Sequence, residues 1–128
     1  MRLKTDLLDV LIDIVEHRLS SRQLEWRPGA AATVVLVASG YPGKVKNGQL
    51  ISGLDEARRV EDVKVYHAGT RWENGKFYTN GGRILNIAAR GATLAEALEK
   101  AYSVAQMIEF EGKDYRKDIG KKGPARER

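Results

Sequence analysis

One helix near the end of the chain sets the strongest limit on the fold. Thr93 and Glu96 form a capping box, in which two side chains three residues apart satisfy the first free amides of a helix. The apolar side chains behind this box recur at helical spacing. They are Leu94, Ala97, Leu98, Ala101, Ala105 and Ile108. Because a helix with one apolar face must bury it against another layer, the sequence predicts a packed helix over residues 93–108.

Several short strands are predicted before this helix. Residues 31–38 form a continuous apolar run, which we interpret as a strand buried on both faces, and residues 63–67 alternate apolar and polar side chains. Asn74 and Gly75 tolerate the positive φ angles of a tight turn, so residues 71–78 are predicted to form a β-hairpin. Residues 84–89 give a further strand.

A second main helix is predicted at the start of the chain. Thr5 can cap it, and the helical spacing of apolar residues continues to about Leu19. Its apolar stripe is broad enough to pack against more than one neighbour. The predicted fold class is therefore α+β, a mostly antiparallel sheet covered on one side by two main helices.

Composition restricts the function classes. The chain has 128 residues, enough for one compact domain, and no apolar run near the roughly 20 residues that span a bilayer, so no membrane partner is expected. It has no cysteine, which fits the cytoplasm and excludes disulfides and thiolate metal sites. Seven basic and three acidic residues from Lys113 onward give +4 of the net charge of +5. We interpret this excess as a disordered basic tail over residues 121–128, and we expect no nucleic-acid partner.

Common catalytic templates do not fit the sequence. Gly43 and Lys44 lack the flanking residues of a phosphate-binding P-loop, and the chain contains no G-x-G-x-x-G. His17 and His67 are far apart and lack the spacing of metal ligands. We therefore assign no catalytic residue and no metal ligand.

Four polar segments predict a ligand-binding rim. Three of them leave or enter predicted strands through glycines, which permit close backbone approach to an anion, and one carries an arginine that can form a bidentate contact with a phosphate or carboxylate. The candidate residues are Tyr41, Lys44, His67, Gly81, Gly82, Arg83 and Asn86. Each also has a structural interpretation, because glycines serve turns, arginines pair with surface carboxylates, and an asparagine can satisfy a backbone group.

These segments resemble a known family. Residues 40–43, 67–70, 81–86 and 115–120 are similar, in order and spacing, to the C-terminal domain of the glycinamide ribonucleotide synthetase (phosphoribosylamine–glycine ligase) family. Residues 2–8 resemble the helix that closes the ATP-grasp region of that family. The resemblance implies that residues 1–120 form this domain and that residues 1–19 are the end of the ATP-grasp region.

The resemblance also implies an activity and its partners. Members join phosphoribosylamine to glycine with ATP in purine synthesis, and Arg83 is the candidate for holding a substrate phosphate or carboxylate. The whole enzyme uses ATP and Mg²⁺, but neither the glutamate two residues before an asparagine nor the Arg-Phe-Gly-Asp-Pro-Glu-like run of its metal site occurs here. We therefore expect that this chain alone binds no cofactor and has no activity. Its expected partner is the amino-terminal and ATP-grasp portion of the ligase. The apolar surface that would contact this portion is also expected to mediate self-association.

A second function remains open at this point. A small domain with a glycine-rich polar rim can act as a stand-alone binding module for a phosphorylated metabolite, or as an interaction subunit, without performing chemistry. A monomeric chain with measurable affinity for a ribose phosphate would favour that alternative.

Overall fold

The computed structural model describes residues 1–121, so the predicted tail lies outside the described residues except for Lys121. The elements, in chain order, are α1 (Leu7–Val15), the 3₁₀ turn η1 (Leu19–Ser21), β1 (Ala30–Val37), β2 (Leu50–Ile51), α2 (Leu54–Arg58), β3 (Val63–His67), β4 (Thr70–Glu73), β5 (Lys76–Thr79), β6 (Arg83–Gly91) and α3 (Leu94–Met107).

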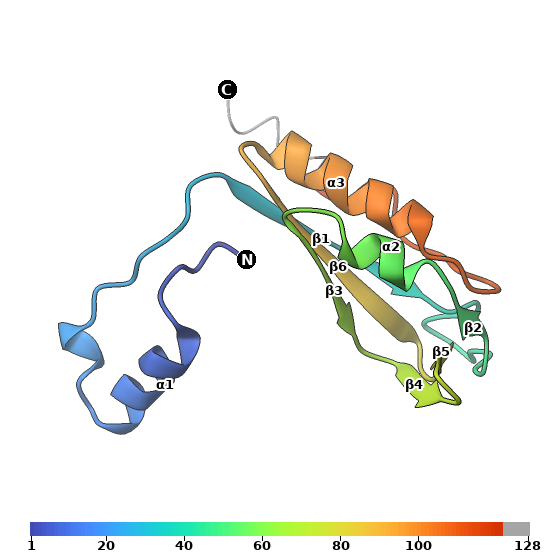
Figure 1. Cartoon of the computed structure of the whole chain (residues 1–128), viewed down its shortest axis with the longest axis horizontal. Helices are drawn as coiled ribbons and strands as arrows, with labels where there is room; N and C mark the ends of the chain where they lie inside the picture. Colours follow the sequence, from blue (N-terminus) through green and yellow to red (C-terminus); the bar gives the residue numbers. More distant parts are fainter. Residues whose placement is uncertain (122–128) are drawn as a thin grey trace.

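The strands form two antiparallel sheets of three strands each, in the orders β1-β6-β3 and β2-β5-β4. The helices α3 and α2 lie over one face of the larger sheet (Figure 1). Leu36 of β1, Leu85 of β6 and Val104 of α3 are fully buried between these layers. The α+β prediction is confirmed, with two small sheets in place of one.

Local sequence chemistry explains α3 and the hairpin. The Thr93 hydroxyl oxygen accepts a hydrogen bond from the Glu96 amide at 3.2 Å, and the Glu96 carboxylate accepts from the Ala92 amide at 2.8 Å. The capping box is thus confirmed, with the glutamate reaching one residue further back than the motif requires. Asn74 and Gly75 have φ angles of 49° and 77°, which confirms the predicted turn between β4 and β5.

The prediction that β1 is buried on both faces is wrong. Val34 and Leu36 are buried under α3, whereas Thr33 is exposed and Val35 and Val37 are only half-buried. The side chains of a strand alternate between faces, and α3 covers only one of them. The other face of the β1-β6-β3 sheet, which we call the open face, is therefore accessible among residues 1–121.

The cap of the first helix differs from the prediction. Asp6, not Thr5, caps α1, and its carboxylate accepts a hydrogen bond from the Leu8 amide at 2.8 Å. The Thr5 hydroxyl is already engaged, because it accepts from the Glu25 amide at 2.7 Å where the chain returns beside its own start. A side chain held by a segment twenty residues away is not available to cap the helix.

The helix also ends earlier than predicted, at Val15 instead of near Leu19. His17 has a φ angle of 55°, a left-handed conformation that stops the α-helix. The chain then turns back so that Arg18 and Arg22 both bind the carboxylate of Asp13, which is 3% exposed. This ion-pair cluster closes α1 and η1 into a small unit of their own.

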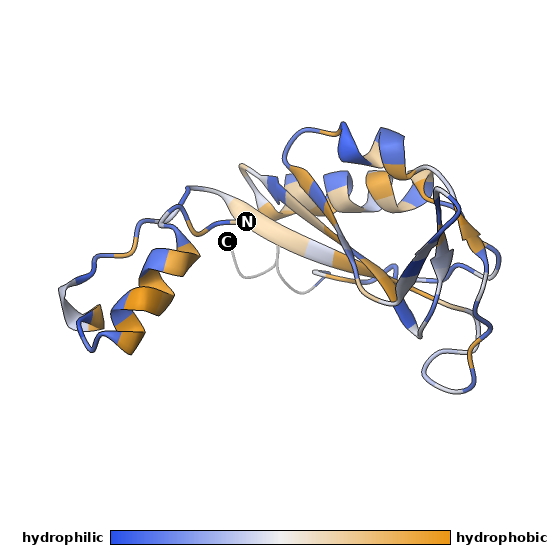
Figure 2. Ribbon diagram, turned by 60° about the horizontal axis from the view of Figure 1, so that its bottom comes forward, coloured by the Kyte–Doolittle hydropathy of each residue, from blue (hydrophilic) through white to orange (hydrophobic). Residues whose placement is uncertain are grey.

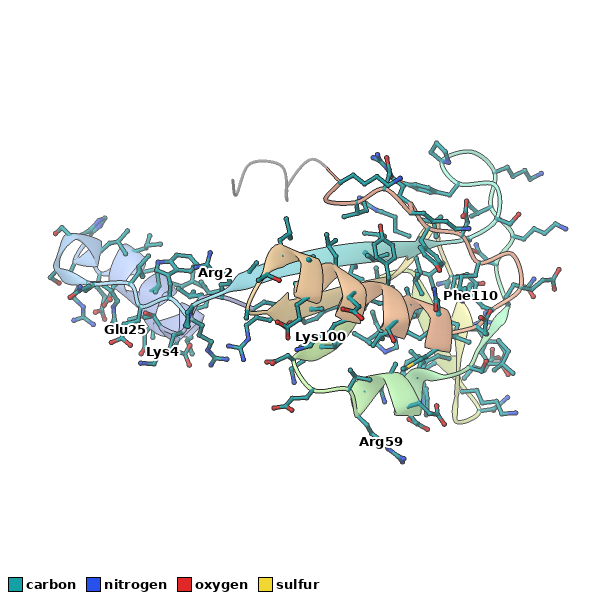
Figure 3. The ribbon with its side chains drawn as sticks, turned by 90° about the horizontal axis from the view of Figure 1, so that it is seen from above. Arg2, Lys4, Glu25, Arg59, Lys100 and Phe110 are labelled. Carbon is teal, nitrogen blue, oxygen red and sulfur yellow. The ribbon has the colours of Figure 1, made fainter. Side chains whose placement is uncertain are left out.

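Residues 1–29, which we call the arm, extend away from the sheet (Figure 1). The prediction that the first helix packs on the sheet is wrong for the described residues, because six of its seven apolar side chains, all but the buried Val10, are 40–76% exposed. These side chains are Leu7, Leu8, Leu11, Ile12, Ile14 and Val15. Figure 2 shows hydrophobic residues along much of α1. In Figure 3, Arg2, Lys4 and Glu25 mark the arm, and Phe110 marks the far end of the domain.

Candidate functional site

A cavity of about 390 Å³ lies beside the open face, between β1 and the segment that follows α3. We call it the β1 pocket. It is lined by Thr33, Val35, Val37, Tyr41, Arg83, Asp114, Tyr115, Arg116 and Ile119. The strand contributes an apolar wall, and charged side chains come from β6 and the closing segment. Such a mixture suits a small ligand with an anionic group.

Glycines bring Tyr41 to this pocket. A Cβ atom on Gly82 would lie 2.5 Å from the Tyr41 ring, so only glycine leaves room for that ring. The amide of Ala38, just before the loop, donates to the Gly82 carbonyl at 2.9 Å and fixes the two segments together. Gly82 therefore supports the pocket by its lack of a side chain.

Gly81 also serves the backbone packing. A Cβ atom on Gly81 would lie 3.1 Å from the Cα of Gly69, and one on Gly69 would lie 2.8 Å from the Arg83 carbonyl. The Gly81 amide already donates to the Asn47 side chain at 2.9 Å. The paired glycines thus let the link between β3 and β4 approach the start of β6.

Arg83 is the free cation of the β1 pocket. Its side chain is exposed, and no ion-pair partner for it occurs within residues 1–121. Arg116, the other arginine of the pocket, is held by Asp118 through hydrogen bonds of 2.9 and 2.7 Å. The hydrogen bond from Arg116 keeps the pKa of Asp118 below its usual value. An incoming anion would therefore find Arg83 unpaired and Arg116 occupied.

The closing segment, residues 113–120, forms one wall of the pocket. Asp114 pairs with Val37 through backbone hydrogen bonds of 2.9 and 3.1 Å. The Tyr102 hydroxyl then donates to the Arg116 carbonyl at 2.9 Å and accepts from the Ile119 amide at 3.0 Å. From the sequence, residues 115–120 are identified only as part of the family resemblance and are not placed on the rim. Their position in the pocket wall is therefore a finding of the structure.

The other candidates lie outside this pocket. Asn86 pairs with Val35, so its side chain belongs to the open face next to the pocket. Lys44 is exposed in the loop after Tyr41, and its carbonyl lies against Gly40. His67 pairs with the buried Leu85 and therefore belongs to the opposite face. The structure thus brings together Tyr41, Gly82 and Arg83, places Asn86 beside them, and separates His67.

His67 has a defined environment of its own. Its Nε2 lies 3.2 Å from the Arg58 guanidinium, and its Nδ1 lies 3.0 Å from the Thr70 hydroxyl. Because a guanidinium only donates, Nε2 must accept and Nδ1 must carry the proton. Burial, reinforced by the charge of Arg58, lowers the pKa of His67 from its usual value. This histidine is therefore neutral near pH 7 and orients Arg58.

Residues 1–121 contain no group of three or more histidine or acidic side chains placed to hold a metal ion. No helix within residues 1–121 has the length and apolar character needed to cross a bilayer.

Comparison with known proteins gives a consistent result. The family model "Phosphoribosylglycinamide synthetase, C domain" matches residues 31–122. The phosphoribosylamine–glycine ligase of Mesorhizobium japonicum is 44% identical over 100% of this chain, which corresponds to 30% of its own length. That of Synechocystis is 46% identical over 94% of this chain, which corresponds to 29% of its own length. The crystal structure of a phosphoribosylamine–glycine ligase from Thermotoga maritima matches with a TM-score of 0.65 and 36% identity, over 84% of this chain and 27% of that chain. The chain thus spans about 30% of the length of the curated relatives it matches.

Proposed function

Because this chain belongs to the family of phosphoribosylglycinamide synthetase C domains, we propose that it is the C-terminal part of an enzyme that joins phosphoribosylamine and glycine with ATP. The observation that carries the proposal is the family match, supported by the free Arg83 guanidinium at the β1 pocket. In this role the chain supplies one wall of the active site in the cytoplasm. The ATP and Mg²⁺ sites belong to the remaining portion of the enzyme.

Arg83 is the residue proposed to bind substrate. A guanidinium can hold a phosphate or carboxylate through two parallel hydrogen bonds, and Arg83 has no competing ion-pair partner among residues 1–121. Tyr41 beside it offers a ring and a hydroxyl, and Asn86 offers an amide on the same face. Gly81, Gly82 and Lys44 are further candidates of the rim, of which Gly82 acts by making room for Tyr41, whereas His67 lies on the opposite face of the sheet.

The arm is proposed to dock on the remaining portion of the ligase. Burying one exposed leucine contributes about 1.5–3 kcal/mol, so a helix with six exposed apolar side chains strongly favours a covered state. Without that portion, the same surface favours self-association. Leu8→Gln combined with Leu11→Gln should abolish self-association seen by analytical ultracentrifugation. Leu50→Gln, which changes a leucine of similar exposure on the domain body, should leave it unchanged.

The catalytic proposal is tested with a chimera. In the Mesorhizobium japonicum ligase, the matched region is replaced by this chain, and phosphate release dependent on ATP, phosphoribosylamine and glycine is measured. The chimera should release phosphate, and this chain alone should release none. An inactive chimera that is folded and binds ATP would contradict the proposal, as would turnover by this chain alone.

Two arginine variants test whether Arg83 binds substrate. Arg83→Ala in the chimera should lower kcat/KM by about tenfold or more, because a charge-assisted hydrogen bond is worth about 1.5–3 kcal/mol. Arg71→Ala removes another exposed arginine, which pairs with Glu73 on the hairpin, and it should have no effect. Equal effects of the two changes would exclude a specific role for Arg83.

The alternative of a stand-alone binding module predicts a different result. The isolated chain would then bind ribose 5-phosphate measurably, and the Arg83→Ala variant would not. An inactive chimera together with binding of ribose 5-phosphate by the isolated chain would favour the binding-module function over the ligase function.

A further inference from the structure

A second cavity, of about 450 Å³, lies on the other side of the molecule between α2 and the β4–β5 hairpin. We call it the hairpin pocket. It shares no lining residue with the β1 pocket and contains none of the predicted site residues. Its volume is within the range of small-molecule sites in proteins. Its composition indicates what kind of molecule it fits.

An exposed aromatic surface forms one side of this pocket. Trp72 is 60% exposed, and its ring centroid lies 4.5 Å from that of Phe77 at an interplanar angle of 59°. Phe77 packs against the core and is also 4.3 Å from the His67 ring. The indole thus packs against Phe77 on the hairpin and keeps most of its surface open. Such a surface suits stacking by a planar ring.

Arg58 is held in place at the same pocket. The neutral His67 accepts a hydrogen bond from its guanidinium, whose central carbon lies 5.8 Å from the Phe77 ring centroid. Its ion pair with the highly exposed Asp55 is loose, at 3.9 Å. Other N–H groups of Arg58 therefore remain free for a ligand at little entropic cost.

The rim of the hairpin pocket carries both signs of charge. Lys76 comes from the hairpin, and Asp55 and Glu56 come from the first turn of α2. The carboxylates can accept hydrogen bonds from an amino group, while Arg58 and Lys76 can bind a phosphate. An aromatic surface with cations and acceptors around it fits a charged heteroaromatic molecule better than an apolar peptide.

We propose that the hairpin pocket binds a purine nucleoside monophosphate, with the base stacked on Trp72 and the phosphate held by Arg58 and Lys76. His67 acts here as a positioning residue, because it fixes Arg58 without lining the pocket. The site is separate from the β1 pocket, with which it shares no lining residue.

The two tryptophans of the chain locate the binding. Trp26 lies on the arm and is 58% exposed, which makes it a control for Trp72. Adenosine 5′-monophosphate is titrated into Trp26→Phe and Trp72→Phe, and tryptophan fluorescence is followed. Saturable quenching is expected in Trp26→Phe, which keeps Trp72, and not in Trp72→Phe. The reverse pattern, or no saturable change in either variant up to millimolar ligand, would overturn the proposal.

Calorimetry measures the contributions to affinity. Trp72→Ala and Arg58→Gln should each weaken binding by about tenfold or more, because stacking and charge-assisted hydrogen bonds are of this size. Arg59→Gln is the matched control, since Arg59 points away from the domain in Figure 3, and it should change affinity by less than about twofold. Ribose 5-phosphate should bind at least about tenfold more weakly than the nucleotide. Equal affinity for both would show an anion site without base recognition and would refute the proposal.

Discussion

Lys113 is predicted to stabilise the domain by closing the C-terminal end of α3. Its ammonium group donates to the carbonyls of Ala105 and Ile108 at 3.2 and 2.5 Å, and it forms an ion pair with Glu109 at 2.8 Å. The side chain is only 11% exposed, unusually low for a lysine. The last carbonyls of a helix lack intrahelical partners, so this lysine supplies the missing donors and places a positive charge at the negative end of the helix.

The expected loss follows from these contacts. A hydrogen bond to a charged group contributes about 1.5–3 kcal/mol, and water can replace part of it after mutation. The exposed ion pair with Glu109 adds at most about 0.5 kcal/mol. Lys113→Met keeps the length of the aliphatic stem and should therefore lower the free energy of unfolding by about 2 kcal/mol. For a domain of this size, the loss corresponds to a Tm lower by about 10 °C.

Urea and thermal unfolding followed by circular dichroism test this value. Lys117→Met is the control, because Lys117 is exposed in the same segment and has no ion pair among residues 1–121. It should remain within about 0.5 kcal/mol of the wild type. Glu109→Gln should cost no more than about 0.5 kcal/mol. If Lys113→Met and Lys117→Met unfold together, the contacts to the helix carbonyls contribute nothing and the reasoning fails.

Two further predictions concern the core and pH. Leu36→Ala empties a fully buried position under α3 and should cost about 2–5 kcal/mol in urea unfolding, whereas Leu50→Ala, at an exposed position, should cost less than about 1 kcal/mol. Because the pKa of His67 is lowered by burial and by Arg58, the unfolded chain binds more protons just below pH 6.5, and stability should fall as pH falls through that range. The urea midpoint of unfolding should therefore fall as the pH is lowered from about 8 to about 5, and His67→Gln should make this dependence on pH weaker. His17→Gln should leave the dependence of the midpoint on pH as it is in the wild type. A slope unchanged by His67→Gln would contradict the assignment.

Elements set by local chemistry are predictable from the sequence. The hairpin follows from Asn74 and Gly75, whose left-handed conformations few other residue pairs tolerate. Helix α3 follows from its capping box and its apolar face. In both cases the decisive contacts lie within a few residues, so no knowledge of the rest of the fold is needed.

The grouping of the site residues depends on strand pairing and is not predictable in the same way. His67 ends a strand just before Gly69, and Arg83 begins a strand just after Gly81 and Gly82, so the sequence places them on one rim. The structure puts them on opposite faces, because His67 pairs with Leu85, and Arg83 pairs with Val37 across a register shift. A shift of one residue moves a side chain to the other face of a sheet, and no local pattern reveals it.

Helices α1 and α3 show that the apolar face of a helix predicts its burial but not the element that buries it. The same periodicity argument applies to α3 and α1, yet α3 packs on the sheet and α1 stays exposed among residues 1–121. The periodicity of apolar residues shows which face of a helix is to be buried. It does not show which other element buries that face, because this depends on the whole assembly. Since the curated relatives are more than three times as long as this chain, the proposed cover for α1 is the portion of the ligase that the chain does not span. On this reasoning, adding that portion should protect the α1 amides from hydrogen exchange and leave those of α3, already buried, unchanged.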